Sequence, residues 1–278
     1  MRIVLLLKMS RPVSWLFAPL VFLLGFACYR GVLTPVSLFQ LVMLSVPYCM
    51  FLYGINDIYD FASDQINPRK QHLVGIRLEP SHHSLVKKVA IVVGVILLAS
   101  SLITLNLMNI FGMGLLLFFS YQYSAPPLRL KERPPLDSIS NGVIYYLAPI
   151  VIGVSYGTIP FNAPVQLYLI TIAVMGIHSF STVTDYSADK EVGDKTFAVV
   201  FGKRAAALFS LVVFAISYFF AGYQGTVINW YLLLLMIFSV IIIVYPSERL
   251  ATVLFYTIGA AFIVVAALLI QMWFNFWS

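Results

Sequence analysis

The chain has 278 residues, of which 61% are hydrophobic and only 10% are charged, and its mean hydropathy is +0.93. A soluble domain carries roughly a quarter charged residues, so this composition excludes one and indicates an integral membrane protein. The net charge of +6 is not gathered in a basic soluble region, and we therefore expect no nucleic-acid partner.

Apolar runs long enough to cross a bilayer, which takes roughly 17–25 residues, follow one another along the whole chain. The first is not a cleavable signal peptide, because it opens at Pro12 and ends in "GFACYRG" without a small-x-small cleavage pattern. We predict an all-α, polytopic membrane protein with one domain, 1–278, and nine transmembrane helices in a single bundle. The predicted spans are 13–29, 36–55, 89–106, 108–124, 138–157, 165–184, 205–222, 226–245 and 250–272.

Charge placement predicts the orientation of these spans. If the spans alternate, sixteen of the seventeen Lys and Arg residues lie on the side of the N-terminus, and only Arg30 lies opposite. Because Lys and Arg in short loops mark the inner side, we expect a cytoplasmic N-terminus and an external C-terminus. All eleven Asp and Glu residues share the cytoplasmic side. Two long loops there, 56–88 and 185–204, are expected to form a cap that carries the chemistry.

An acidic motif, "NDIYDFASD", directly follows the second span. Asp57, Asp60 and Asp64 are spaced i, i+3, i+7, so on a continuing helix all three fall on one face. The sixth span is followed by "DYSADKEVGDKT", in which Asp185 and Asp189 are spaced i, i+4 on the expected extension of that span. Asp194, in the loop beyond, is a predicted substrate-binding residue.

Carboxylates stacked this closely repel one another, and the repulsion grows near the membrane boundary, so cations between them are expected. Oxygen ligands alone, with Asn56 as a neutral one, suit a hard ion such as Mg²⁺ rather than zinc. Because Mg²⁺ keeps positions open for phosphate oxygens, two facing groups predict a metal-bridged diphosphate. The predicted metal ligands are Asn56, Asp57, Asp60, Asp64, Asp185 and Asp189.

Basic residues next to the motifs fit the same anion. Arg69 follows the first motif, Lys195 closes the second, and Arg129 with Lys131 lies in the loop after the fourth span. We expect them to neutralise a leaving diphosphate, Lys195 as a catalytic group. Other basic residues near span ends, such as Lys203 and Arg204, are interpreted as topology signals.

With these two motifs the chain resembles the UbiA-type intramembrane prenyltransferase superfamily. "NDIYDFASD" is similar to its N-D-x-x-D-x-x-x-D signature, and Asp185 with Asp189 to its D-x-x-x-D motif, here followed by Gly-x-Lys-Thr. The resemblance implies Mg²⁺-dependent transfer of a prenyl group from an isoprenyl diphosphate to a hydrophobic acceptor, in a cavity open to membrane lipids. The sequence departs from the family pattern after "NPR", where "KQHLVG" replaces a second Arg-Pro pair and puts a role of His72 in question.

Further likeness concerns the acceptor. "SRPVSWLFAP" and "YSAPPLRLKERPPLDSISNG", which begins at Tyr123, resemble the lycopene elongase branch, whose members extend the ends of a carotenoid with a five-carbon donor. An aromatic quinone precursor, a chlorophyll-like alcohol and a glycerol-lipid hydroxyl remain alternative acceptors. Spans five and six read as apolar, with Gly153 and Gly176 expected to leave room between helices for a long chain.

A few polar residues inside the spans are further substrate-binding candidates. His178 lies seven residues before Asp185, on the same helical face and about 10 Å deeper. It can line the cavity, accept a proton from the product cation, or simply bond to a neighbouring helix. Asn141 and Tyr145, one turn apart in span five, are weaker candidates, as is Tyr123.

Two functions of other classes are compatible with clustered acids. A divalent-cation transporter would place acidic residues at mid-membrane depth, whereas all eleven lie in or beside the cytoplasmic loops. A non-catalytic assembly protein has no need of two acidic motifs. A CDP-alcohol phosphotransferase would carry a D-G-x-x-A-R-type motif, which this sequence lacks.

Overall fold

The structure is a computed structural model that describes residues 2–66, 76–220, 222 and 226–275. Within these residues the chain forms α-helices joined by 3₁₀-helical turns, one π-helical turn and irregular connections, and no strand occurs among them. The predicted all-α class is confirmed for this part of the chain. The residues divide into two compact units, unit 1 (Met1–Arg129 with Ala148–Pro160) and unit 2 (Leu130–Leu147 with Phe161–Ser278).

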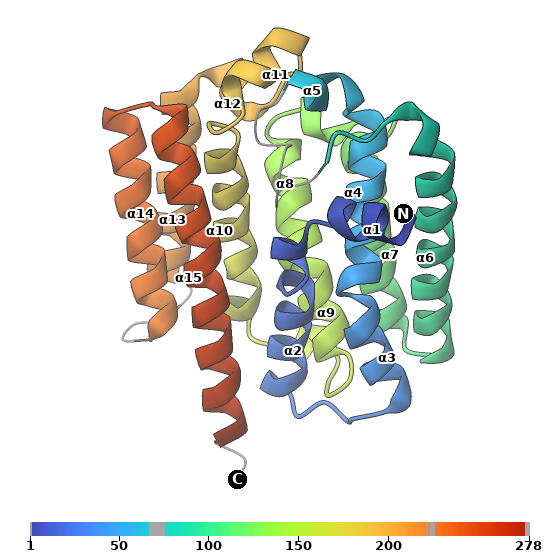
Figure 1. Ribbon diagram of the computed structural model, residues 1–278. Helices are drawn as coiled ribbons and strands as arrows, with labels where there is room; N and C mark the ends of the chain where they lie inside the picture. The colour runs from blue at the N-terminus through green and yellow to red at the C-terminus, as the bar shows by residue number, and fades with distance from the viewer. Residues whose placement is uncertain (1, 67–75, 221, 223–225, 276–278) are drawn as a thin grey trace. The chain divides into compact units, whose positions relative to one another are not determined.

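Unit 1 consists of helices that pack in neighbouring pairs (Figure 1): α4 contacts α6 and α7, α7 contacts α9, and α9 contacts α2. Short 3₁₀ turns at Pro12–Ser14 and Pro80–His82 precede α2 and α6. The helices are α1 (Arg2–Met9), α2 (Phe17–Cys28), α3 (Pro35–Met43), α4 (Val46–Tyr59), α5 (Phe61–Ile66), α6 (His83–Ile103), α7 (Leu107–Ser124) and α9 (Ala148–Val154).

Local signals in the sequence set where two of these helices begin. The Thr34 hydroxyl accepts the Ser37 backbone N–H, and the Ser37 hydroxyl accepts the Thr34 backbone N–H, which is a capping box at the start of α3. At the start of α7 the Asn106 side chain accepts the backbone N–H groups of Met108 and Asn109. Both caps satisfy donors that the first helical turn leaves without a partner.

Unit 2 is organised around α13, which packs against α10 and α14, while α15 packs against α14 and α10 (Figure 1). Its core is apolar and includes Phe180, Phe214, Leu235 and Ile242. A 3₁₀ turn at Leu130–Glu132 precedes α8, a π-helical turn at Val143–Leu147 follows it, and a 3₁₀ turn at Pro160–Asn162 precedes α10. The helices are α8 (Leu136–Gly142), α10 (Val165–Ser181), α11 (Tyr186–Val192), α12 (Phe197–Phe201), α13 (Lys203–Phe220), α14 (Val227–Val244) and α15 (Glu248–Asn275).

Two glycines allow neighbouring helices to approach closely. A Cβ atom at Gly153 in α9 would lie 2.1 Å from the carbonyl oxygen of Phe22 in α2, and one at Gly176 in α10 would lie 2.5 Å from Cγ2 of Val213 in α13. Small residues at such crossings are a common device of membrane helices. The prediction that Gly153 and Gly176 leave room between helices is therefore wrong, because the neighbouring helix fills the space.

The described helices include six that are long and apolar enough to cross a membrane. Two bent pairs, Arg2–Met9 with Pro12–Cys28 and Val165–Ser181 with Tyr186–Val192, raise the number to eight if each pair is one span. Helix α7 matches the predicted span 108–124, but polar side chains such as Asn109 and Gln122 keep its hydropathy below that of the six. The count of nine spans stays a prediction. The six are Pro35–Tyr59, Pro80–Ile103, Leu136–Val154, Lys203–Phe220, Val227–Val244 and Glu248–Gln271.

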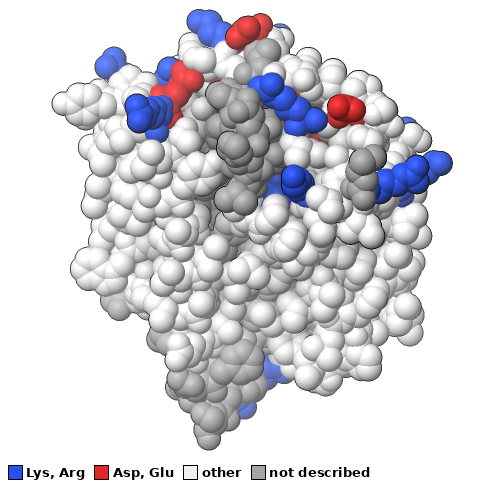
Figure 2. Space-filling model, in the orientation of Figure 1, with Lys and Arg blue, Asp and Glu red and all other residues white. Residues whose placement is uncertain are grey.

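Charged side chains are unevenly distributed on the surface. Figure 2 shows that much of the visible surface carries no charged side chain. Large apolar side chains stay exposed instead, with Val95 at 61%, Phe111 at 56% and Ile237 at 56%. Helices whose outer faces contact lipid have this distribution, so the structure is that of an integral membrane protein.

The structure corrects two expectations about helix ends. The first acidic motif does not continue one helix, because α4 ends at Tyr59, Asp60 caps it, and α5 begins at Phe61. Nor is α11 a straight extension of the sixth span, since α10 ends at Ser181 and α11 is bent from it by 71°. His178 was predicted to lie on the same helical face as Asp185 and about 10 Å deeper, which requires one straight helix. The bend removes that geometry, and His178 lies in the last turn of α10.

Candidate functional site

The first acidic group lies at the end of α4 in unit 1 and is almost fully buried. Asp57 is 0% exposed, Asp60 6% and Asp64 5%. Asn56 lies within the same group, because its Nδ2 donates to Asp60 Oδ2 and, over 2.9 Å, to the Ser124 hydroxyl. Buried carboxylates are stable only when they are paired or bonded to donors, so the partners of this group define the site.

Arg11 is one of those partners, although it was not among the predicted site residues. Its Nη2 lies 2.8 Å from Asn56 Oδ1 and 3.0 Å from Asp57 Oδ1, while its guanidinium lies 4.1 Å from the centre of the Tyr53 ring. Its backbone adopts a φ of +53°, which is unfavourable for a residue with a side chain. The signal that could have identified it is its place in "SRPVSWLFAP", the segment that carries part of the family resemblance.

Arg129 is the second cation of the first group and was predicted. Its Nη2 lies 3.8 Å from Asp60 Oδ1, and its Nη1 donates to the carbonyl oxygens of Tyr59, over 3.2 Å, and Ser124, over 3.4 Å. These contacts connect the end of α7 to the end of α4. The structure thus brings Arg129 together with Asn56 and Asp60, as the prediction of a basic residue near the first motif requires.

The second acidic group lies in unit 2, beyond the bend that follows α10. Asp185 precedes α11, and its Oδ2 accepts a bond of 3.2 Å from the Thr184 hydroxyl. Asp189 lies one helical turn further and accepts a bond of 3.0 Å from the Thr196 hydroxyl. Burial, together with the neighbouring Asp185 carboxylate, raises the pKa of Asp189 to about 7, although the Thr196 bond opposes the shift. The two carboxylates therefore repel each other as the sequence analysis expected.

Lys131 and Asp137 hold the segment that follows α11. Lys131 Nζ lies 2.7 Å from Asp194 Oδ2, and both side chains are nearly buried. Asp137, which is 0% exposed, accepts the backbone N–H groups of Ser138 over 2.6 Å and of Phe197 over 3.1 Å. Lys131 and Asp194 were predicted as substrate-binding residues, whereas Asp137 was counted only as an acid. Here Lys131 and Asp194 are engaged with each other.

The remaining predicted residues occupy different surroundings. His178 is half-buried, and its Nδ1 lies 3.2 Å from the Ser138 hydroxyl, so a bond to a neighbouring helix, one of the expected readings, is present. Asn141 is buried and donates to the Asp137 carbonyl oxygen over 3.0 Å. Tyr123 and Tyr145 are half-buried.

Two predicted cations differ from Arg129 and Lys131. Lys195 is exposed and makes no hydrogen bond or ion pair with any residue in the described ranges. Arg69, like His72, falls in 67–75 and lies outside the described residues.

The oxygen donors of the two acidic groups are compatible with a divalent metal ion. Among the residues that the structure describes, no three His, Cys, Asp or Glu side chains converge on one point as a ready-made metal site. Each acidic group nevertheless offers only hard oxygen donors, and burial together with the neighbouring Asp185 carboxylate raises the pKa of Asp189. Both features fit Mg²⁺, which takes one or two carboxylates per ion and completes its shell with water and phosphate oxygens.

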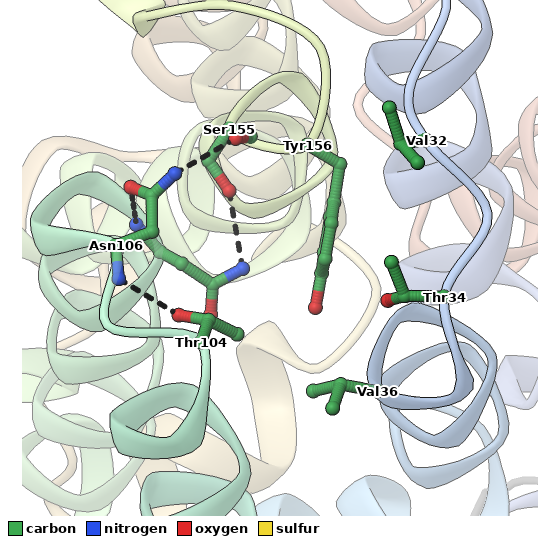
Figure 3. Close-up of a pocket in the computed structure, with 8 residues that line it drawn as sticks. Val32, Thr34, Val36, Thr104, Asn106, Ser155 and Tyr156 are labelled. Carbon is green, nitrogen blue, oxygen red and sulfur yellow. Dashed lines mark hydrogen bonds between the residues drawn. The ribbon is translucent and has the colours of Figure 1, made fainter.

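A pocket whose lining residues are all uncharged lies elsewhere in unit 1. It has a volume of about 350 Å³, and Figure 3 shows Tyr156 and Thr34 on one side of it and Asn106 and Thr104 on the other. Behind it, buried Gln40 bonds to Asn109 over 3.0 Å and accepts the Tyr156 hydroxyl over 2.8 Å. These side chains bond to one another and hold the connections α2–α3 and α6–α7 to the end of α9.

Comparison with known proteins identifies the kind of site that the acidic groups form. The profile of the UbiA prenyltransferase family matches residues 16–253. A lycopene elongase/hydratase from Haloarcula japonica is 31% identical over 248 residues, which are 87% of this chain and 79% of the relative. A second lycopene elongase/hydratase, from Corynebacterium glutamicum, is 31% identical over 219 residues, which are 78% of this chain and 76% of the relative.

A solved structure has the same fold as this chain. The UbiA homologue from Archaeoglobus fulgidus bound to DMAPP (dimethylallyl diphosphate) and Mg²⁺ has a TM-score of 0.71 at 23% identity, and the match covers 98% of both chains. The family match spans well over half of the sequence and includes both acidic motifs. The resemblance inferred from "NDIYDFASD" and "DYSADKEVGDKT" is therefore confirmed, and the chain belongs to the UbiA prenyltransferase family.

Proposed function

We propose that this prenyltransferase transfers a five-carbon prenyl group from dimethylallyl diphosphate to the end of a linear carotenoid such as lycopene, and that the reaction requires Mg²⁺. We infer the acceptor from the relatives named lycopene elongase/hydratase, which match this chain across most of their own length at 31% identity. The donor is the diphosphate bound, together with Mg²⁺, to the Archaeoglobus fulgidus homologue of the same fold. The cation-transporter alternative is excluded by membership of a family of enzymes.

The carboxylates of both acidic groups are proposed to bind the donor through the metal. When bound, Mg²⁺ withdraws charge from the diphosphate and so stabilises it as a leaving group. Asn56, Asp57, Asp60 and Asp64 serve in unit 1, and Asp185 and Asp189 in unit 2. Arg11 and Arg129 hold the first group in position through the contacts described above and add positive charge beside it.

The bond changes follow from this arrangement of charge. The allylic C–O bond breaks and both of its electrons leave with the diphosphate, whose negative charge Lys195 and Arg69 are proposed to neutralise. A terminal C=C bond of the acceptor then supplies the electron pair for the new C–C bond. The cation that remains on the product is quenched by loss of a proton or by addition of water, for which His178 is the candidate base.

The acceptor is proposed to enter from the lipid, because a carotenoid is too apolar to leave the membrane. The predicted residues Asn141, Tyr123 and Tyr145 are candidates for contact with it, and ring faces of Tyr residues can shield a carbocation. An aromatic acid would be expected to require a cation to bind its carboxylate within the apolar spans. The spans contain no Lys or Arg at such depth, which favours the carotenoid.

The test is expression in a host that produces lycopene. Products heavier than lycopene by one or two five-carbon units, with or without added water, are expected by mass spectrometry, because both ends of the polyene are equivalent. The same membranes should be offered an aromatic acid and a glycerol lipid with five-, fifteen- and twenty-carbon diphosphates. Unchanged lycopene together with prenylation of one of these acceptors would reject the carotenoid and leave the prenyltransferase.

The acidic side is proposed to face the cytoplasm in the cell membrane, with the N-terminus inside. This proposal rests on the distribution of Lys and Arg. The test uses a protein in which Cys28 and Cys49 are replaced and one new cysteine is introduced. Glu191 on α11 is exposed, Leu105 between α6 and α7 is 87% exposed, and the two positions are predicted to lie on opposite sides of the membrane. In intact cells an impermeant thiol reagent should label Leu105→Cys only. Labelling of Glu191→Cys before lysis contradicts the orientation.

A further inference from the structure

The acidic helix α11 has little apolar contact to fix its orientation. It contains seven residues, none of them buried, and Tyr186 is the residue through which it packs against the hydrophobic core of unit 2. A helix this short is not stable by itself in water. The directions of Asp185 and Asp189, which precede and belong to α11, must therefore depend on polar contacts.

Glu248, the first residue of α15, supplies such contacts. Its Oε1 accepts the Ser187 hydroxyl over 2.7 Å, and its Oε2 accepts the Ser187 backbone N–H over 3.3 Å. Lys203, the first residue of α13, lies 2.6 Å from Glu248 Oε1, and its Nζ lies 4.4 Å from the centre of the Tyr186 ring. Two carboxylate oxygens and one ammonium group thus join α11 to the first residues of α13 and α15.

The bond to the Ser187 backbone has a specific consequence for Asp185. An Asp that directly precedes a helix most often accepts a backbone N–H of the first turn with its own side chain. Asp185 occupies that position but makes no such bond. Glu248 accepts the Ser187 N–H in its place, so the Asp185 carboxylate is not drawn back onto its own backbone.

We propose that Glu248 is a positioning residue, which holds Ser187 at the start of α11 and so keeps the Asp185 carboxylate directed toward the metal-bound diphosphate. The proposal rests on the proposed function, because it takes Asp185 to be a metal ligand. Without Glu248, Asp185 turns to the N–H groups of its own helix, and metal binding weakens while the chemical step is preserved.

The experiment measures metal binding without turnover. Mn²⁺ replaces Mg²⁺, inorganic pyrophosphate replaces the donor, and the signal of free Mn²⁺ in electron paramagnetic resonance gives the dissociation constant. Glu248→Ala should raise it about 10-fold, since loss of a partner that orients a ligand typically costs about 10–100-fold in metal affinity. Glu191→Ala is the matched control, because Glu191 is an exposed acid on α11 for which the described structure records no contact, and it should stay within about twofold of the parent.

The Mg²⁺ dependence of turnover is a second, independent measure of metal affinity. The Mg²⁺ concentration for half-maximal rate should rise in Glu248→Ala by the same factor as the Mn²⁺ dissociation constant, with kcat at saturating Mg²⁺ within about twofold of the parent. Glu248→Gln keeps an acceptor oxygen for Ser187 and should restore most of the affinity. Lys203→Met should act in the same direction as Glu248→Ala, whereas Arg204→Met should have no effect, because Arg204 bonds to the Ile243 carbonyl oxygen instead.

The outcomes separate this inference from the proposed function. One outcome is that Glu248→Ala has the same unfolding midpoint temperature as the parent protein and binds Mn²⁺ with pyrophosphate within twofold of it, while Asp185→Asn loses binding. In that case the role proposed for Glu248 is wrong and the proposed function stands. If Asp185→Asn also keeps full binding and turnover, the proposed function itself fails. If Glu248→Ala does not fold, the Mn²⁺ affinities and Mg²⁺ dependences of Glu248→Gln and Lys203→Met test the role of Glu248 instead.

Discussion

The two acidic groups are held in different ways. The first lies at the end of α4, a helix packed between α6 and α7, and its buried carboxylates contact the guanidinium groups of Arg11 and Arg129. The second lies on and beside α11, in which Asp189 is only half-buried, and hydroxyl groups donate to Asp185 and Asp189. Burial and the Asp185 carboxylate raise the pKa of Asp189 to about 7. The first group thus has direct contacts with two guanidinium groups, whereas the recorded bonds of Asp185 and Asp189 come from hydroxyl groups.

The largest expected effect comes from removing one carboxylate of either group. Asp57→Asn and Asp185→Asn should each lower turnover by about 10²-fold or more, because a preorganised charge at the leaving group is lost. Glu79→Gln, an exposed acid on the same predicted side, should leave turnover unchanged. Rates are measured as diphosphate released by purified protein in lipid. A variant of Asp57 or Asp185 that works at the rate of Glu79→Gln contradicts the assignment of its group.

A smaller effect is expected from the cation of the first group. Arg11→Gln should lower turnover about 10-fold. It should also lower the free energy of unfolding by about 1–3 kcal/mol, because the buried Asp57 loses a charged partner. Arg30→Gln is the control, since Arg30 has a similar positive φ of +50° but lies outside the acidic group. Thermal unfolding in detergent and the release assay give both quantities. Equal loss in the two variants would show that the contact of Arg11 with the first acidic group adds nothing.

Both acidic motifs, most helix positions and the family could be predicted because they depend on residue type and spacing alone. The predicted spans 205–222 and 226–245 differ from α13 and α14 by two residues or fewer at either end. The role of Arg11 could not be predicted, since its contact with Asp57 joins residues 46 positions apart. Nor could the bend between α10 and α11, because the helical spacing of Asp185 and Asp189 is the same on a straight or a bent segment.

Two lysines of the second group should differ from each other. Lys131→Met breaks the 2.7 Å pair with Asp194, and the nearly buried Asp194 left behind should lower the free energy of unfolding by about 1–3 kcal/mol. Lys195→Met removes an exposed charge with no recorded partner in the described residues, so stability should not change. If Lys195 neutralises the diphosphate, the KM for the donor should still rise about threefold, which is within the range for an exposed charge pair. An unchanged KM removes Lys195 from the site.

The smallest effect on turnover is expected at Gln40, whose recorded hydrogen bonds go to neither acidic group. Gln40→Leu removes a buried side chain that bonds to Asn109 over 3.0 Å and to the Tyr156 hydroxyl over 2.8 Å. The free energy of unfolding should fall by about 1–3 kcal/mol while turnover stays within about twofold. Gln122→Leu, a half-buried glutamine on α7, is the control for the change in polarity. A large loss of turnover at unchanged stability would show that Gln40 and its partners contribute to catalysis.

The central claim is that both carboxylate groups serve one Mg²⁺-dependent transfer of a five-carbon group to a carotenoid. The most direct measurement uses purified protein in lipid vesicles that contain lycopene, supplied with isotopically labelled dimethylallyl diphosphate and Mg²⁺, and follows both the mass of the carotenoid and the release of diphosphate. The account predicts labelled products one or two five-carbon units heavier than lycopene, formed together with diphosphate and lost on chelation of Mg²⁺ or in Asp57→Asn and Asp185→Asn. Labelled product that persists in either variant, or with Mg²⁺ chelated, would contradict it.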